Sequence, residues 1–143
     1  MEIAFNMEEA LYHLALIGIA FVLSIPIALN REHSTRGAGL RTFPLVTISA
    51  CAFMLVGMSV YEGSDAEARV MYGIITGMGF IGGGSIIKTD EGTSGTATAA
   101  GIWLTGAIGL AVAYQRYEIA VVLSLAGFCI FQLSGYLKDR VID

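Results

Sequence analysis

Long blocks of hydrophobic residues alternate with short polar segments along the whole chain. Five of these blocks match a membrane-spanning helix in length, since crossing a hydrocarbon core of roughly 30 Å takes about 20 helical residues. The polar segments between them read NREHSTRGAGLRT, EGSDAEAR, KTDEGTSGT and QRYE. We therefore predict five transmembrane helices, at about residues 10–29, 43–61, 70–87, 97–114 and 119–137.

Composition favours the same fold class. The chain has 143 residues, of which 55% are hydrophobic and 14% charged, whereas a soluble domain carries about 25% charged residues. No polar segment is long enough for a second domain. The sequence thus predicts an all-α, polytopic transmembrane helical bundle in which residues 1–143 form a single domain. Its acidic start, MEIAFNMEEALYH, is unlike a basic signal peptide, so we expect the first block to be retained.

Lysine and arginine residues predict the orientation, because they stay on the cytoplasmic side of the membrane. With the N-terminus outside, two basic residues, Arg69 and Arg116, are external. Six are then internal: Arg31, Arg36, Arg41, Lys88, Lys138 and Arg140. This bias predicts an N-out, C-in protein with five crossings.

The third block contains the glycine-rich stretch TGMGFIGGGSII, in which Gly77, Gly79 and Gly82 spell G-x-G-x-x-G. A dinucleotide site needs these glycines between a strand and a helix, with an acidic residue about twenty positions later. Here they lie within a predicted span, and the segment WLTGAIGLA at that distance has no acid. We therefore expect no nucleotide. The net charge of −4 likewise argues against a nucleic-acid partner.

Two structural roles remain open for these glycines. Small residues let helices approach closely in lipid, as the G-x-x-x-G pairs Gly73/Gly77 and Gly79/Gly83 would allow. The fourth block has a matching stripe of small residues every four positions: Ala97, Gly101, Thr105, Gly109 and Ala113. The third and fourth helices are then expected to pack along these faces. Alternatively, the triplet 82–84 interrupts the third helix, since each glycine costs a helix about 1 kcal/mol relative to alanine. Interrupted helices often form ion sites in transporters.

The segment between the first two blocks is rich in basic residues. Arg31, Glu32, Arg36 and Arg41 lie within eleven residues, and Gly39 gives the backbone freedom near the second helix. Arg41 is expected either to extend to the membrane interface or to turn inward, toward Glu32 or the end of an interrupted helix.

Three stretches taken in order resemble the MgtC/SapB family of bacterial inner-membrane proteins. They are REHSTRGAGLRTFPLV (31–46), GIITGMGFIGGGSII (73–87) and GTATAAGIWLTGAIGLAVA (95–113). The resemblance implies a multi-pass inner-membrane protein linked to magnesium limitation and, in some pathogens, to survival inside host cells. Matching family positions are Arg31, Gly39, Leu40, Arg41, Thr42, Gly77, Gly79, Phe80, Gly82, Gly84, Thr98, Ala99, Ala100 and Trp103.

Three departures from the family pattern affect what is carried over. Asn30 stands where the family usually has a glutamate, which weakens a cation site built there. Ser24 and Ala28, beside Pro26, replace glycines near the end of the first span. Many members also have a soluble C-terminal domain, whereas this chain ends at Asp143, so we expect the membrane domain only.

Two functions are compatible with this pattern, and an enzyme is not expected, because no nucleophile lies beside a base. The first is a non-catalytic regulator of other membrane transport or energy-coupling proteins. The second is a homodimeric channel or transporter for magnesium or another small ion, with a path near Gly82–Gly84.

No cofactor is expected, and whether a metal binds is open. Expected partners are the lipid bilayer, a second copy of the chain and other transport proteins. The candidate residues are Arg31, Glu32, Arg36, Gly39, Leu40, Arg41 and Thr42 in the loop; Gly73, Gly77, Gly79, Phe80, Gly82, Gly83 and Gly84 in the third helix; and Thr98, Gly101, Trp103, Thr105 and Gly109 in the fourth.

Overall fold

The protein is an all-α helical bundle with a small hairpin at one end, as the sequence predicts. The computed structural model describes residues 6–34, 38–90 and 92–141. Its elements are, in order, α1 (Met7–Ser34), α2 (Thr42–Val60), α3 (Ser64–Gly84), β1 (Ile87–Thr89), β2 (Gly92–Ser94), α4 (Thr96–Ala113) and α5 (Tyr117–Val141). β1 and β2 pair antiparallel, with Lys88 opposite Thr93.

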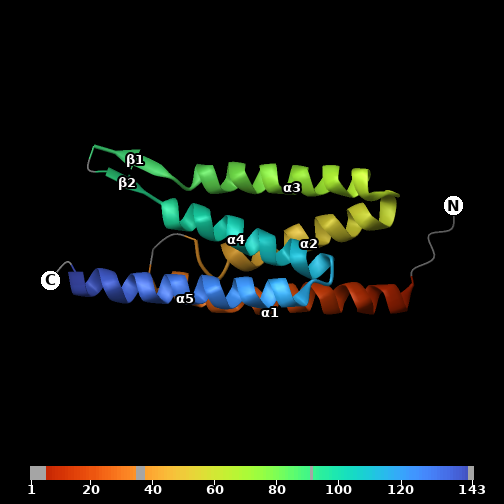
Figure 1. Cartoon of the computed structure of the whole chain (residues 1–143), viewed down its shortest axis with the longest axis horizontal. Helices are drawn as coiled ribbons and strands as arrows, with labels where there is room; N and C mark the ends of the chain where they lie inside the picture. The colour runs from red at the N-terminus through yellow and green to blue at the C-terminus, as the bar shows by residue number, and fades with distance from the viewer. Residues whose placement is uncertain (1–5, 35–37, 91, 142–143) are drawn as a thin grey trace.

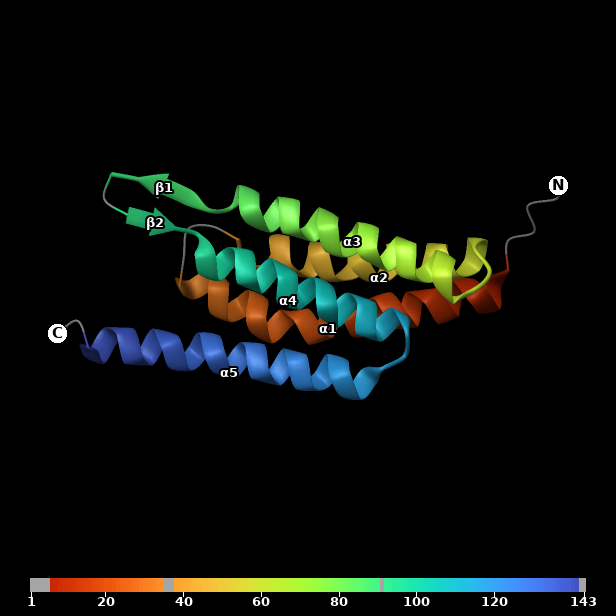
Figure 2. The same ribbon diagram turned by 45° about the horizontal axis from the view of Figure 1, so that its top comes forward.

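The helices run back and forth along one common direction (Figures 1 and 2). α1, α3 and α5 point one way, and α2 and α4 point the other. The N-terminal end of α1 and the C-terminal end of α5 therefore lie at opposite ends of the bundle. We call the end that carries β1 and β2 the hairpin end, and the end where α2 turns into α3 the turn end.

Helix bounds agree with the predicted blocks most closely for α2 and α4. The third helix differs, because it begins at Ser64, within the predicted polar segment, and ends at Gly84. Asp65 and Glu67 lie in its first turn, where negative side chains interact favourably with the helix dipole. Polar residues that looked like a connecting loop therefore start the helix.

The glycine triplet lies at the C-terminal end of α3. The helix is continuous from Ser64 to Gly84, so these glycines form its last residues and do not interrupt it. The amide of Ser85 donates to the carbonyl of Gly82 at 3.0 Å, and that of Ile86 to Gly83 at 3.1 Å. These shorter-range bonds tighten the last turn before the chain enters β1.

α4 is the central helix of the bundle and packs against each of the other four helices. Its small residues allow this, because a helix surrounded on all sides must let several backbones approach. The carbonyl of Gly101 accepts a hydrogen bond from the hydroxyl of Thr105 at 2.9 Å, so this buried side chain is satisfied within its own helix. Large side chains from neighbouring helices fill the space beside the small ones, among them Phe43 and Met78.

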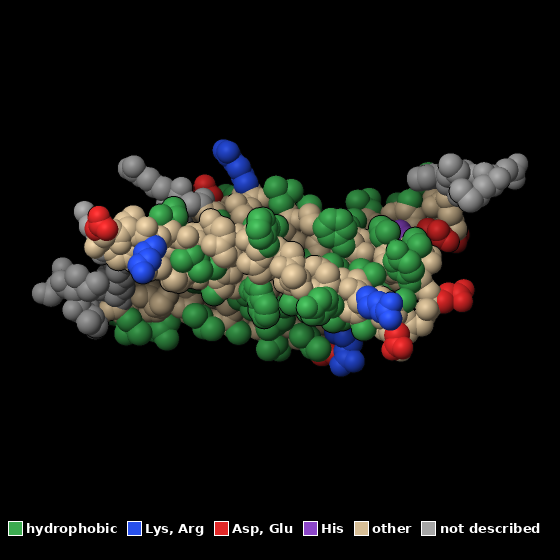
Figure 3. Space-filling view, turned by 90° about the horizontal axis from the view of Figure 1, so that it is seen from above, with side chains coloured by type: hydrophobic (Ala, Val, Ile, Leu, Met, Phe, Trp, Pro, Cys, Tyr) green, Lys and Arg blue, Asp and Glu red, His purple; other side chains and the backbone are tan. Residues whose placement is uncertain are grey.

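Hydrophobic side chains cover much of the outer surface, as expected for a protein surrounded by acyl chains (Figure 3). Among the described residues, four helices are long and apolar enough to cross a bilayer, namely α1, α2, α4 and α5. α3 is not one of them; it carries Asp65, Glu67 and Arg69 near its start, and six of its 21 residues are glycine. Its length of about 32 Å would still cross the hydrocarbon core. Five crossings therefore stay a prediction.

Candidate functional site

A pocket of about 600 Å³ opens at the hairpin end, where the ends of α1 and α3 meet the start of α4. We call it the terminal pocket. Its wall is partly polar, with one arginine, several hydroxyl groups and the first turn of α4, and partly apolar. The residues that line it are Arg31, Ala38, Thr42, Ile81, Gly84, Ser85, Ile87, Ser94, Gly95, Thr96, Ala97, Thr98 and Ile102.

Arg31 joins three helices at this pocket. Its side chain, on α1, is only 9% exposed. One terminal nitrogen, Nη2, donates a hydrogen bond to the hydroxyl of Thr98 on α4 at 3.2 Å. The guanidinium carbon lies 5.0 Å from the ring centroid of Phe131 on α5, within the range of a cation–π interaction. The sequence predicted roles for Arg31 and Thr98, but nothing in it indicated that they touch.

The predicted loop residues divide into a buried and an exposed group. Glu32 accepts a hydrogen bond from the amide of Leu40 at 2.9 Å. A Cβ at Gly39 would overlap the carboxylate of Glu32, so glycine lets the chain pass close beside it. The side chain of Arg41 is exposed at the start of α2, and Thr42 lines the terminal pocket. Arg36, also predicted here, lies outside the described residues.

The glycines of α3 do not act as one packing face. A Cβ at Gly82 would lie 3.3 Å from the carbonyl oxygen of Ala99, so α3 and α4 approach closely there. Gly79 faces the indole nitrogen of Trp103 at 3.7 Å. Nothing lies within 4 Å of a Cβ at Gly73 or Gly77. The prediction that this pair packs against the fourth helix is therefore wrong.

The remaining positions of the third-helix set have open space beside them. Gly83 and Gly84 also have nothing within 4 Å of an added Cβ. The side chain of Phe80 is 85% exposed and belongs to the lining of a pocket between α2 and α3.

The small-residue face of α4 packs mainly on α2, whereas the sequence suggested α3. A Cβ at Gly101 would lie 2.8 Å from the ring of Phe43, and one at Gly109 would overlap the carbonyl oxygen of Thr47. Thr105 is fully buried between them. Period-four spacing identified this face, but which helix would cover it depends on how the chain folds back.

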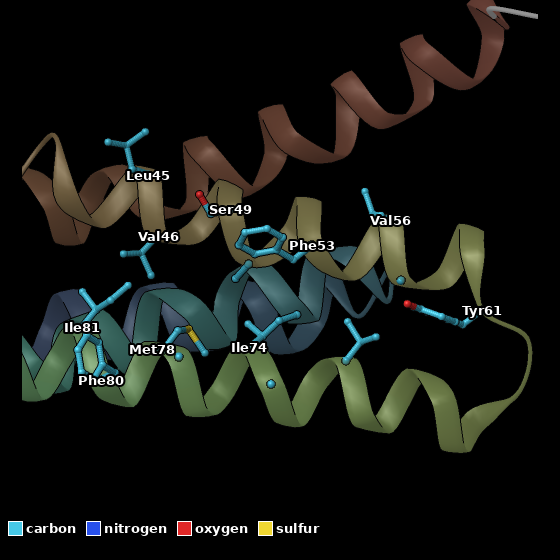
Figure 4. A pocket seen from close by; sticks show the side chains of 15 residues that line it. Leu45, Val46, Ser49, Phe53, Val56, Tyr61, Ile74, Met78, Phe80 and Ile81 are labelled. Carbon is cyan, nitrogen blue, oxygen red and sulfur yellow. The ribbon is translucent and has the colours of Figure 1, made fainter. Parts of the chain in front are cut away.

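An apolar groove of about 760 Å³ runs between α2 and α3 (Figure 4). We call it the α2–α3 groove. Gly73 and Gly77 line it on the α3 side, where both are exposed and nothing described lies within 4 Å of an added Cβ. Side chains of both helices line it, including Phe53, Val56, Ile74, Met78 and Ile81. Its lining has hardly any polar side chains, apart from Ser49 and Tyr61.

Sequence reasoning missed three residues that shape these sites. Phe131 contacts Arg31 but reads as one more hydrophobic residue of α5. Gly95 adopts a left-handed conformation, with φ of 84°, directly before α4. Gly106 accommodates Met78, because a Cβ there would overlap its sulfur. Only Gly95 had a usable signal, since glycine next to a helix start in SGT is typical of a turn.

Within the described residues, no group of three or more His, Cys, Asp or Glu side chains is placed to hold a metal ion.

Comparison with known proteins gives several similar chains and no significantly matching solved structure. SrpB of Synechococcus elongatus is 31% identical over 140 residues, covering 85% of this chain and 77% of SrpB. YhiD of Escherichia coli K12 is 31% identical over 126 residues, covering 82% of this chain and 58% of YhiD. MgtC of Brucella abortus is 37% identical over 91 residues, covering 64% of this chain and 38% of MgtC.

The family model described as the MgtC family matches residues 17–140. This range holds most of α1, all of α2 to α4, the hairpin and nearly all of α5. It includes every candidate residue named from the sequence. With a match over most of its length, and relatives that align across the membrane helices, this chain is a member of the MgtC family.

Proposed function

We propose that this chain is a non-catalytic regulator in the bacterial inner membrane that modulates other transport or energy-coupling proteins during magnesium limitation. The observation that carries the proposal is the α2–α3 groove, where exposed glycine backbone lies between two walls of apolar side chains. Gly73 and Gly77 present a G-x-x-x-G face with nothing within 4 Å of an added Cβ in the described part of this chain. A transmembrane helix of another protein can approach such a face closely.

Magnesium enters the proposal through the relatives. The names of the Brucella MgtC proteins place them in this family, and the name of YhiD refers to magnesium transport. Those names say what the relatives are called and do not by themselves assign an activity to this chain. This chain spans little more than half of YhiD and less than half of MgtC, so their activities carry over only as a proposal.

Filling the groove tests the regulator. Gly77→Leu would place a large side chain in the groove, at a position where nothing lies within 4 Å of an added Cβ. We expect this variant to insert and fold normally but to lose support of growth at low magnesium, in a strain that lacks its own copy. The matched control is Gly135→Leu on α5, where nothing lies within 4 Å of a Cβ either. Equal growth of the two variants would count against docking in the groove.

The terminal pocket favours a second candidate, the homodimeric channel or transporter. Because α3 is continuous, an ion path could not pass through a helix break and would instead begin beside its end at Gly84. Flux of Mg²⁺ into liposomes containing the purified protein would favour the transporter. Absence of flux, together with the Gly77→Leu growth defect, would favour the regulator.

A further inference from the structure

Pro26 lies in the interior of α1, where it weakens the helix backbone. Proline has no amide hydrogen, so the carbonyl of Val22 lacks the donor that a helix normally places four residues later. α1 changes direction partway along its length (Figure 2), as helices with an internal proline usually do. The other proline, Pro44, lies in the first turn of α2, where helix amides have no partner in any case. Pro26 is therefore the position at which α1 bends with least resistance.

A serine on α5 binds the backbone of α1 directly before this proline. The hydroxyl of Ser124, which is buried, donates to the carbonyl of Leu23 at 2.6 Å. Other buried helical hydroxyls, such as those of Thr47 and Thr105, donate to carbonyls of their own helix, which is the usual local pattern. The bond of Ser124 instead joins two helices and restrains α1 within one turn of Pro26.

α5 also contacts α1 directly after the proline. A Cβ at Gly127 would lie 2.9 Å from Cδ1 of Ile27 and would overlap a methyl group of Leu104 on α4. Glycine at this position therefore lets α5 pass close to both helices. Because Ser124 and Gly127 are three residues apart, they share one face of α5. This face touches α1 on both sides of Pro26.

The part of α1 beyond the proline, residues 27–34, is attached to its neighbours by side-chain hydrogen bonds of its own. We call it the α1 arm. The side-chain amide of Asn30 donates to the side-chain oxygen of Gln132 on α5 at 2.7 Å. Arg31 donates to the hydroxyl of Thr98 on α4 at 3.2 Å, in the wall of the terminal pocket. Such bonds contribute little individually, because a broken bond is replaced by bonds to water. They hold the arm in place without making it immovable.

We propose that the α1 arm is a strap that turns about Pro26, and that Ser124 sets the angle of the hinge in the closed arrangement. The strap is closed in this structure, with Arg31 bonded to Thr98 and the end of α1 against the start of α4. Turning the arm outward breaks that bond and widens the terminal pocket between α1 and α4. The hinge thus gives the hairpin end two arrangements, a narrow and a wide one. The proposal goes beyond the regulator function and does not depend on it.

The test follows the arm by ¹⁹F NMR of the purified full chain in detergent micelles. Cys51 and Cys129 are replaced by alanine. A trifluoromethyl label is attached through the substitution Leu29→Cys, at a position on the arm whose side chain is exposed. We expect two resonances of unequal intensity, the major one from the closed arrangement and the minor one from the open arrangement.

Three substitutions in this labelled protein should shift the intensities in defined directions. Ser124→Ala is expected to raise the minor intensity about fivefold, because the closed arrangement loses one hydrogen bond. Thr98→Val removes the bond to Arg31 and should raise it by a similar factor or more. Pro26→Ala restores the missing backbone donor, so it should stiffen the hinge and lower the minor intensity.

The matched control is Ser134→Ala. It removes the same hydroxyl from the same helix, but this hydroxyl donates to the carbonyl of Phe131 within α5, at 3.1 Å. The intensities should stay within about twofold of the labelled parent, because such a local bond leaves the contact between helices unchanged. Resonances whose number, position and intensity are the same in all variants would overturn the proposal. An equal change in Ser124→Ala and Ser134→Ala, or an undiminished minor resonance in Pro26→Ala, would overturn it as well.

Discussion

Gly109 lies where α4 crosses α2, and the backbone of α2 occupies the space where a side chain would be. A Cβ there would overlap the carbonyl oxygen of Thr47 and lie 3.1 Å from the Cβ of Ala50. Both neighbours belong to a buried helix segment that cannot move aside without disturbing its own packing. Single residues of this kind determine how closely the two helices approach.

We expect Gly109→Ala to lower the free energy of unfolding by about 1–3 kcal/mol, the usual cost of overpacking a core. The control is Gly135→Ala on α5, which has open space around it and should be neutral or up to about 1 kcal/mol more stable, since alanine favours the helix. Thermal unfolding in detergent, followed by circular dichroism, measures both. Equal melting temperatures for the two variants would contradict the close contact.

Tyr114 links α4 to α3 at the turn end. Its hydroxyl donates to the Glu67 carboxylate at 3.1 Å. Burial, followed by this hydrogen bond and the negative charge of Glu67, raises the pKa of Tyr114 above its ordinary value. Because the folded pKa is raised, the bond stabilises the fold fully below about pH 10, the ordinary tyrosine pKa, and is lost as pH rises through the higher folded value.

We therefore expect Tyr114→Phe to cost about 1 kcal/mol at neutral pH. The difference between wild type and variant should shrink as the pH is raised above about 10. Melting temperatures of both proteins are measured from pH 7 to 11. Because the two proteins share all other titrating groups, the difference between their melting temperatures reports on Tyr114. A difference that stays constant over this range would exclude the proposed bond.

At the scale of elements, the end of α3 leads through the β1–β2 hairpin to the start of α4. Gly95 makes the last step possible. Its φ of 84° lies in the region that favours glycine, and a Cβ there would overlap the carbonyl oxygen of Ser85. The hydroxyl of Ser85 also donates to the carbonyls of Gly82 and Gly95, at 2.6 and 3.4 Å. The end of α3 and the start of α4 are thereby fixed to each other beside the terminal pocket.

Replacing Gly95 with alanine should destabilise the bundle by about 1–3 kcal/mol, because a left-handed residue with a side chain is strained. Gly84→Ala is the matched control, since it changes the last residue of α3, where nothing lies within 4 Å. The control should melt within a few degrees of wild type. A Gly95→Ala protein as stable as the control would show that the junction tolerates a side chain.

At the scale of the whole molecule, the two ends of the bundle differ in charge. Arg31, Arg41 and Lys88 lie at the hairpin end, and Arg69 and Arg116 at the turn end. Lys138 and Arg140, which the orientation also counts, have side chains outside the described set. The alternating helix directions place the hairpin end on the cytoplasmic side if the basic residues determine the orientation.

Cysteine labelling tests this topology and the crossing by α3 directly. Glu62→Cys, in the turn between α2 and α3, and Asp90→Cys, in the hairpin, are introduced separately after Cys51 and Cys129 are replaced by alanine. We expect an impermeant maleimide to label Glu62→Cys in intact spheroplasts, and Asp90→Cys only after lysis. Labelling of both before lysis would mean that α3 does not cross, and the reverse pattern would invert the orientation.

Much of this architecture follows from hydropathy alone. Five hydrophobic blocks gave five helices, because a backbone in hydrocarbon must satisfy its hydrogen bonds internally and helices do so within a single segment. The bounds of α2 and α4 agreed within one residue with the predicted blocks at 43–61 and 97–114. The family, too, was identifiable from three short stretches. Hydrophobic blocks and family stretches are each made of residues that are neighbours in the chain, so they can be recognised from the sequence alone.

The tertiary structure decided which faces meet. Small residues spaced by four predicted a close contact for α4, but only the folded chain shows that α2 provides it, while Gly73 and Gly77 of α3 face a groove. Arg31 and Thr98 are 67 residues apart in sequence and meet only because the end of α1 lies beside the start of α4. The spacing of small residues along a helix determines which of its faces another helix can approach closely. The folding back of the chain determines which neighbour reaches it.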